Sequence, residues 1–185
     1  MLAGVTSPSP DTGYPMTAHS FAPSQAPVIQ PENPEDAAAV EALLDHAFGP
    51  GRFTKASERV REFADFAPEL SFCAWDGPRL VGSVRQWRAR VGETPVVFLG
   101  PLAVEQGERS AGVGGRLVTR ACEAAAQAGE QVVLLVGDGP YFQRFGFAAE
   151  PAKAVRLPGP VDQRRVLVRQ VGGEAVDLAG DVVAR

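Results

Sequence analysis

Residues 105–116 read EQGERSAGVGGR and separate an apolar run that ends at Val104 from an amphipathic segment over residues 112–128. Glycines at the start of a helix let a ligand approach the backbone closely. The free N–H groups there, with the positive end of the helix dipole, favour an anion such as a pyrophosphate. Arg109 and Arg116 add positive charge. Neither the lysine of a nucleotide-hydrolysing loop nor the spacing of a dinucleotide fingerprint is present, so the turn predicts a different anion site.

The segments on either side of this turn predict a parallel strand–helix–strand unit. Residues 112–128 carry apolar side chains at helical spacing, and residues 131–136 form a continuous apolar run typical of a buried parallel strand. The strand before the turn, over residues 96–104, is interrupted at Gly100-Pro101. Because proline has no N–H for a ladder, we expect a bulge or splay there that leaves the backbone of residues 102–104 free to bond elsewhere.

The rest of the chain predicts short elements around this unit. They are a strand at Val28 and Ile29, helices over residues 36–48 and 56–66, a hairpin of strands over 70–75 and 80–87, a short aromatic helix over 141–145, a strand over 165–171 and a weak tail.

Length and composition limit the classes of function. A chain of 185 residues predicts one domain, and 18 basic against 22 acidic residues give a net charge of -4 with no basic stripe, so nucleic acid is not expected as a partner. The mild acidic balance slightly favours a cationic acceptor. Cys73 and Cys122 have no spacing typical of a disulfide framework or a zinc site, so we expect no metal and a reducing compartment.

The N-terminal residues 1–26 are rich in proline and small polar residues and carry no Lys or Arg. They predict a disordered tail without the features of a signal peptide. No apolar run approaches the roughly 20 residues that span a bilayer, so we expect no membrane partner and a cytoplasmic location.

Two motifs in order resemble one enzyme family. Residues 109–114, RSAGVG, match the (Q/R)-x-x-G-x-G signature of the GCN5-related N-acetyltransferase (GNAT) family, and residues 137–147, GDGPYFQRFGF, are similar to its short helix and closing strand. LVGSVR at residues 80–85 and LGPLAV at residues 99–104 agree with its strand order. The similarity is strongest to the bacterial YhbS-like branch and covers residues 27–150. Residues 151–185 are then expected either to complete the sheet or to form an interface, such as that of a homodimer.

This resemblance implies a fold and a cofactor. The fold is α/β (α+β), a mixed, mostly antiparallel sheet with a central parallel βαβ unit, splayed strands and helices on both faces. The cofactor is acetyl-CoA. Backbone groups of Leu102, Ala103 and Val104 would meet its pantetheine arm and thioester. The pyrophosphate turn corresponds to Arg109, Ser110, Ala111, Gly112, Val113 and Gly114, continued by Gly115 and Arg116, and a bulky residue in place of Gly112 or Gly114 should block it. Asp138 matches a position that contacts the pantetheine arm, or it caps the helix that follows it.

The chemistry implied is direct acetyl transfer to a primary amine of a small molecule, peptide or protein. The family often uses a tyrosine as the acid, and its position here holds Phe142, which has no proton to give; Tyr141, one residue earlier, is either the acid or a structural aromatic. His46, Glu93 and Glu105 are candidates for a base, each with an equally ordinary structural interpretation. Two alternatives stay open: an inactive acyl-CoA sensor or scaffold, and a protein-interaction domain that uses the aromatic residues 141–147.

Overall fold

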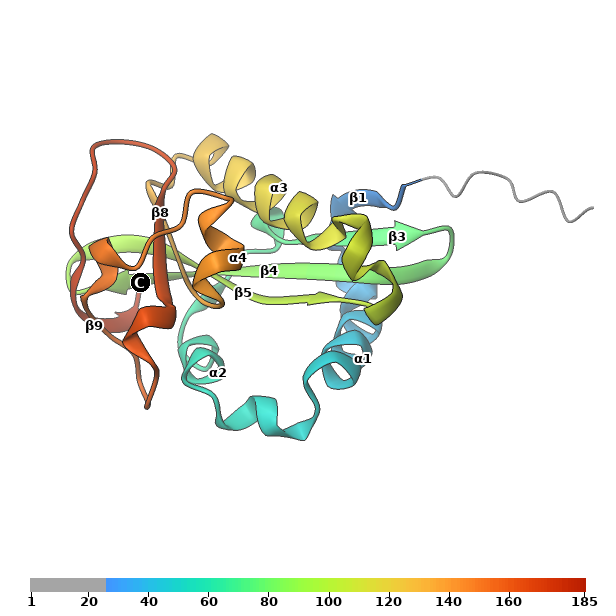
Figure 1. Cartoon of the computed structure of the whole chain (residues 1–185), viewed down its shortest axis with the longest axis horizontal. Coiled ribbons are helices and arrows are strands. Elements are labelled where there is room, and N and C mark those ends of the chain that lie inside the picture. Colours follow the sequence, from blue (N-terminus) through green and yellow to red (C-terminus); the bar gives the residue numbers. More distant parts are fainter. Residues whose placement is uncertain (1–25) are drawn as a thin grey trace, which may run out of the picture.

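The computed structural model describes residues 26–185, so the tail expected over residues 1–26 lies outside the described residues except for Ala26. The fold is built on an open mixed sheet with the strand order β1-β3-β4-β5-β6-β8 (Figure 1). The strands are β1 (Val28–Pro31), β3 (Phe72–Asp76), β4 (Arg79–Val91), β5 (Thr94–Val104), β6 (Val132–Val136) and β8 (Val166–Gln170). All neighbours are antiparallel except β5 and β6. The predicted mixed sheet with one parallel unit is confirmed.

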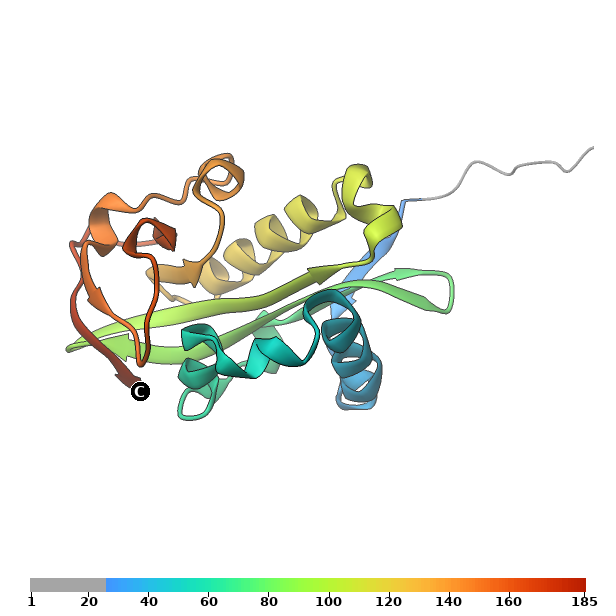
Figure 2. The ribbon, with the colours of Figure 1, turned by 60° about the horizontal axis from the view of Figure 1, so that its bottom comes forward.

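Helices cover both faces of the sheet (Figures 1 and 2). The helices α1 (Ala37–Phe48) and α2 (Ala56–Arg61) lie on one face, and α3 (Val113–Gln127) lies on the other with α4 (Gly139–Gln143). Short 3-10 segments join them: η1 (Pro34–Asp36), η2 (Pro50–Thr54), η3 (Pro68–Leu70), η4 (Gln106–Ala111), η5 (Glu150–Ala152) and η6 (Gln163–Arg165). None of the helices in residues 26–185 is long and apolar enough to cross a membrane.

Two predicted helix boundaries were wrong. The helix expected over residues 56–66 ends at Arg61, because Phe66 belongs to the short strand β2 (Asp65–Phe66), which pairs with β4 and packs its ring 4.9 Å from that of Trp87. The aromatic helix expected over residues 141–145 is α4, which begins at Gly139 because Asp138 caps it there, and which ends at Gln143.

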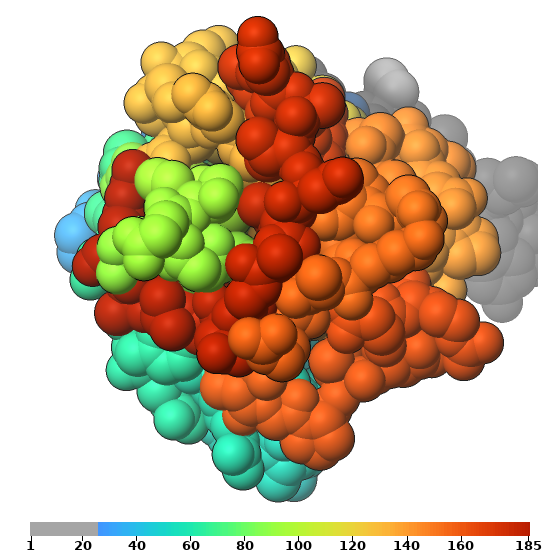
Figure 3. Space-filling view, turned by 90° about the vertical axis from the view of Figure 1, so that its left-hand side faces the viewer, coloured from blue at the N-terminus to red at the C-terminus, as the bar shows by residue number. Residues whose placement is uncertain are grey.

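The C-terminal residues contain more strand than the sequence predicts. The strands β7 (Ala154–Arg156) and β9 (Ala179–Ala184) pair with each other, and β9 also pairs with the end of β4. Figure 3 shows this C-terminal segment, in red, against the tip of the β4–β5 hairpin, in light green. Residues 151–185 therefore pair with β4 and β6 of the same chain.

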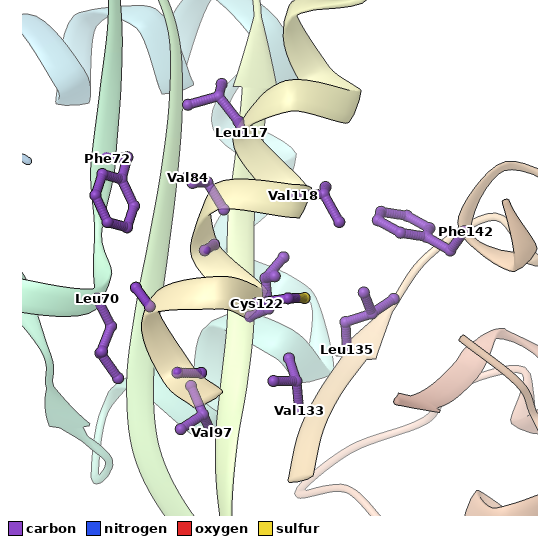
Figure 4. Close-up of a cluster of buried hydrophobic side chains, with 14 of the residues drawn as sticks. Leu70, Phe72, Val84, Val97, Leu117, Val118, Cys122, Val133, Leu135 and Phe142 are labelled. Atoms are coloured by element: carbon purple, nitrogen blue, oxygen red, sulfur yellow. The ribbon is translucent and has the colours of Figure 1, made fainter. Parts of the chain in front are cut away.

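The core on the α3 side of the sheet consists of the apolar stripe of that helix and the side chains below it (Figure 4). Leu117, Val118 and Cys122 are at most 1% exposed and face the strands, as the helical spacing predicts. Phe142 points into the same core towards Val118 and Leu135. Burial of these side chains supplies the main driving force that fixes α3 and α4 over the sheet.

The strands β5 and β6 diverge as the sequence predicts. They pair only at Val97 with Val133 and at Phe98 with Leu134, so residues 102–104 have a strand partner on the β4 side alone. The expected bulge lies in β5: Val84 pairs with Leu102 and Gln86 with Leu99, so Gly100 and Pro101 stand opposite the single residue Arg85 of β4. Because the two strands diverge, the backbone of residues 102–104 has no strand partner on the side of β6. These residues lie just before η4 and α3 in the chain.

Candidate active site

A cavity of about 1280 Å³ opens at the fork between β5 and β6. Its walls come from the end of β5, the first turn of α3, the start of α4, the α2 region and the residues before β8. This volume exceeds the roughly 300–1,000 Å³ usual for a small-molecule pocket, which suits a long ligand together with a second substrate.

The predicted glycine turn forms one end of the cavity. Gly112 has φ +73°, a left-handed conformation that favours glycine, and it precedes α3 without any side-chain cap. The first N–H groups of a helix have no partner within the helix, so the uncapped start of α3 fits an anion. Arg109, Ser110, Gly114, Gly115 and Arg116 also line the cavity; Ala111, which is exposed, and Val113, which is buried in the core, do not.

The aromatic side chains of α4 pack directly on this turn. A Cβ added to Gly114 would lie 2.8 Å from the Tyr141 hydroxyl oxygen, and one added to Gly115 would lie 2.9 Å from the Phe145 ring. Any other residue at these positions would push the aromatic rings away from α3. The absence of side chains therefore serves two purposes, close ligand approach and room for Tyr141.

Tyr141 and Phe142 point in different directions. Phe142 is 9% exposed and packs in the core, edge-on to Phe147 at 5.8 Å. Tyr141 is half-buried and lines the cavity together with Leu102, Ala103 and Val104. Burial raises the pKa of Tyr141, although the guanidinium of Arg144 opposes the effect. The hydroxyl therefore stays protonated at neutral pH.

Asp138 is a helix cap. Its carboxylate accepts a hydrogen bond from the Tyr141 backbone N–H at 3.0 Å, while the residue also lines the cavity. This cap fixes where α4 begins, and with it the direction of the Tyr141 side chain.

A chain of alternating charges reaches the α2 side of the cavity, where two of its members, Arg52 and Glu58, belong to the lining. Arg85 donates to Glu32 at 2.7 Å and to Glu41 at 2.5 Å, and Arg52 donates to Glu41 at 2.7 Å. Arg52 also lies 3.7 Å from Glu58 of α2. Burial would raise the pKa of Glu41, but the hydrogen bonds from Arg52 and Arg85 outweigh it and lower that pKa. The network ties β4 and Glu32, the residue after β1, to α1, η2 and α2.

Comparison with known proteins identifies the family. Residues 38–147 match the model of the acetyltransferase (GNAT) family. The chain belongs to this family. The protein named uncharacterized N-acetyltransferase YjhQ, from Escherichia coli strain K12, is 30% identical over 90% of this chain and 93% of its own length. The expected enzyme class, an N-acetyltransferase with acetyl-CoA as donor, is confirmed.

Solved structures of GNAT proteins share the fold. The GNAT N-acetyltransferase YhbS from Escherichia coli, in complex with CoA, superposes with a TM-score of 0.73 at 25% identity and covers 90% of this chain and 94% of its own. A GNAT acetyltransferase from Brucella melitensis, in complex with acetyl-CoA, gives a TM-score of 0.63 at 23% identity and covers 86% and 96%. The predicted likeness to the YhbS-like branch is confirmed.

The candidate bases do not meet at the cavity of this GNAT protein. His46 and Glu105 lie 3.9 Å apart, and neither lines it. Glu93 is 96% exposed in the turn between β4 and β5, where it pairs with Arg90. On the α2 side the carboxylates of Glu58 and Asp162 line the cavity, and sequence reasoning missed both because no motif marks their places.

Arg61 is a second residue that the sequence did not single out. It pairs with Glu58 and lies 6.0 Å above the Trp87 ring. Burial, with the nearby charge of Arg52, lowers the pKa of Arg61 to about 10, which still leaves it charged at neutral pH. Glu58 is therefore shared by two arginines and is not a free base.

Proposed function

We propose that this GNAT protein transfers the acetyl group of acetyl-CoA directly to a primary amine of a small molecule, a peptide or a protein. The observation that carries the proposal is the position of the Tyr141 hydroxyl, against Gly114 at the uncapped start of α3 and inside a cavity that continues to α2. One cavity thus combines a place for phosphates, a proton donor and room for an acceptor.

The first turn of α3 and the edge of β5 would hold the donor. The N–H groups of Gly114 and Gly115 suit the pyrophosphate, with Arg109 beside them. Arg116 lines the same wall and is held by a hydrogen bond to the Pro27 carbonyl at 2.7 Å. The free backbone edge of residues 102–104 suits the amides of the pantetheine arm. Bound acetyl-CoA supplies an activated acyl thioester.

Tyr141 would act as the acid. As the amine nitrogen forms its bond to the acyl carbon and the bond to sulfur breaks, the Tyr141 hydroxyl donates its proton to the leaving sulfur. A pKa raised by burial keeps that proton available at neutral pH. The proton of the amine passes to solvent in the open cavity, since Glu58 is already paired with Arg52 and Arg61.

A second candidate function is an acyl-CoA sensor or scaffold without turnover. The observation in its favour is Phe142, which stands where the family often has its tyrosine and is buried in the core. A sensor would bind acetyl-CoA and leave every amine unmodified.

The test combines binding and turnover. Calorimetric titration with acetyl-CoA and an acetylation assay over a broad amine panel are run on the parent protein and on Tyr141→Phe. We expect the variant to bind acetyl-CoA as the parent does and to lose about 10²-fold or more in kcat. Binding by the parent without transfer would favour the sensor, and no binding by folded parent would contradict the proposed donor site.

We also propose a cytoplasmic location, supported by Cys73 and Cys122, which are buried and free in the described part of the chain. A homodimer stays a prediction, to be checked by measuring the mass in solution.

A further inference from the structure

The cations of the chain divide into those that have a carboxylate partner and those that do not. In residues 26–185, eight cations have no carboxylate within 4.0 Å: Lys55, Arg59, Arg109, Arg116, Arg120, Arg144, Arg165 and Arg169. Six of these eight line the active-site cavity; only Arg59 and Arg169 do not. The chain carries a net charge of -4, so its positive charge is concentrated where ligands would bind.

Four of the six cations belong to the proposed donor side. Arg109 lies on η4, Arg116 and Arg120 on α3, and Arg144 directly after α4. Acetyl-CoA carries a pyrophosphate and a further phosphate on its ribose, and these four guanidinium groups are suited to that charge.

The other two cations, Lys55 and Arg165, come from a different part of the cavity wall. Lys55 is the residue directly before α2, and Arg165 ends η6. The loop before η6 meets α2, because a Cβ added to Gly159 of this loop would lie 3.5 Å from the Ala56 Cβ. The segment 160–165 therefore forms one wall with the start of α2, and Arg165 stands at the end of this segment, beside the Gly137 carbonyl.

The carboxylates of that wall are neutralised within the protein. Glu58 is shared by Arg52 and Arg61, and Asp162 accepts two hydrogen bonds from the Arg164 guanidinium, at 2.8 and 3.1 Å. Among the described residues, the lining carboxylates without an ion pair are Glu123 of α3 and Asp138 before α4, which belong to the same elements as the donor-side cations.

The two cations keep most of their hydrogen-bonding capacity. Arg165 donates only its Nε–H, to the Gly137 carbonyl at 3.3 Å, which leaves its terminal NH₂ groups for another partner. The Lys55 ammonium lies 5.2 Å from the centre of the Phe48 ring and has no carboxylate partner in residues 26–185. Such groups suit a carboxylate or a phosphate.

We propose that the acceptor is a primary amine that also carries an anionic group, a carboxylate or a phosphate, and that Lys55 and Arg165 bind this group. The inference rests on the proposed function and deepens it. It reverses the slight preference for a cationic acceptor that the overall composition suggests, because the charge at the cavity wall is opposite to the net charge of the chain.

The first experiment compares matched amines. Each amino acid of a panel is paired with the amine that lacks its carboxylate, and O-phosphoethanolamine is paired with ethanolamine; rates are corrected for the neutral fraction of each amine. We expect kcat/KM to be about 10-fold to 100-fold higher for the anionic member, the range given by a charged hydrogen bond. The carboxylate and phosphate pairs show which anion is preferred.

Variants then test the two residues. Lys55→Met and Arg165→Met should remove this preference while leaving acetyl-CoA binding and the neutral amines unchanged. Lys153→Met and Arg156→Met are the controls, since Lys153 and Arg156 are exposed, paired with Glu150 and Asp181, and off the cavity. Weaker acetyl-CoA binding in the two test variants would overturn the inference by assigning both cations to the donor.

Calorimetric binding of the same amine pairs to the CoA-saturated protein separates this inference from the proposed function. Preferential binding of anionic amines without transfer would contradict the transfer step and leave the inference standing. No preference between pair members, in transfer or in binding, would overturn the inference even if acetylation occurs.

Discussion

Gly114→Ala tests whether Tyr141 depends on the glycine beneath it. The added Cβ would lie 2.8 Å from the Tyr141 hydroxyl oxygen, against 3.4 Å or more in ordinary contacts, so the hydroxyl must move by about 0.6 Å. The ring has little freedom to absorb the shift, since its centroid lies 4.9 Å from that of Phe142 and 5.4 Å from that of Phe145.

The expected cost falls on catalysis. Misplacement of a catalytic group by about 1 Å costs roughly 100-fold in rate, so we expect kcat at saturating acetyl-CoA to fall by about 10-fold to 100-fold. Stability should change by less than about 2 kcal/mol, because alanine is the better helix former by about 1 kcal/mol and overpacking costs about 1–3 kcal/mol. Gly107→Ala is the matched control, with no atom within 4 Å of its added Cβ.

A double-mutant cycle with Tyr141→Phe identifies the contact. The next atom of the Tyr141 side chain, Cζ, lies 4.0 Å from the added Cβ, so a phenylalanine ring at position 141 leaves room for alanine at position 114. We therefore expect Gly114→Ala to lower kcat little further in the Tyr141→Phe background, and the two losses not to multiply. Full kcat in Gly114→Ala, or losses that multiply in the double variant, would refute this reasoning.

Three further results concern core side chains and one paired carboxylate. Phe142→Tyr should not restore activity to Tyr141→Phe, and it should destabilise the fold by about 1–3 kcal/mol in urea unfolding, because its new hydroxyl enters an apolar core. Burial raises the pKa of the Cys73 and Cys122 thiols to about 12 and about 11. At pH 8 a thiol reagent should label them only as fast as the protein unfolds, and their contribution to stability should be lost as pH rises above 9 towards those values. The pKa of Glu41 is lower in the folded protein than its ordinary value near 4.5. The ionised carboxylate therefore stabilises the fold above pH 4.5, and this contribution is lost as the pH falls through the lowered pKa. In Glu41→Gln the free energy of unfolding should fall less as the pH is lowered. An unchanged fall would mean that other groups cause it.

Local chemistry explains what the sequence predicts well. The glycine turn before α3, the apolar stripe of that helix and the divergence of β5 after Phe98 each depend on residues close together in the chain. The helix start and the interrupted strand at Gly100-Pro101 are therefore visible as patterns.

Pairings across the chain explain what the sequence misses. Glu32 and Arg85 are separated by 53 positions, yet their ion pair begins the network that ends at Glu58. The strand β9 has no strong alternation of its own and is fixed by its pairing with β4, about 90 positions earlier. The sequence around one member of such a pair does not indicate the other member. The α2 side of the cavity could therefore be described only from the structure.

The direction of Tyr141 shows how a shift of one residue in α4 changes a site. The helix is only five residues long, so its phase depends on its ends and not on a repeated pattern. Asp138 fixes the start through its bond to the Tyr141 N–H, and Gly137 gives the Phe142 ring its place in the core, because a Cβ there would lie 2.3 Å from that ring. With Phe142 anchored inward, its neighbour is turned by about 100° towards the cavity. Phe142, at the position where the family often has its tyrosine, thus orients the helix, and the proposed proton donor, Tyr141, stands one position before it.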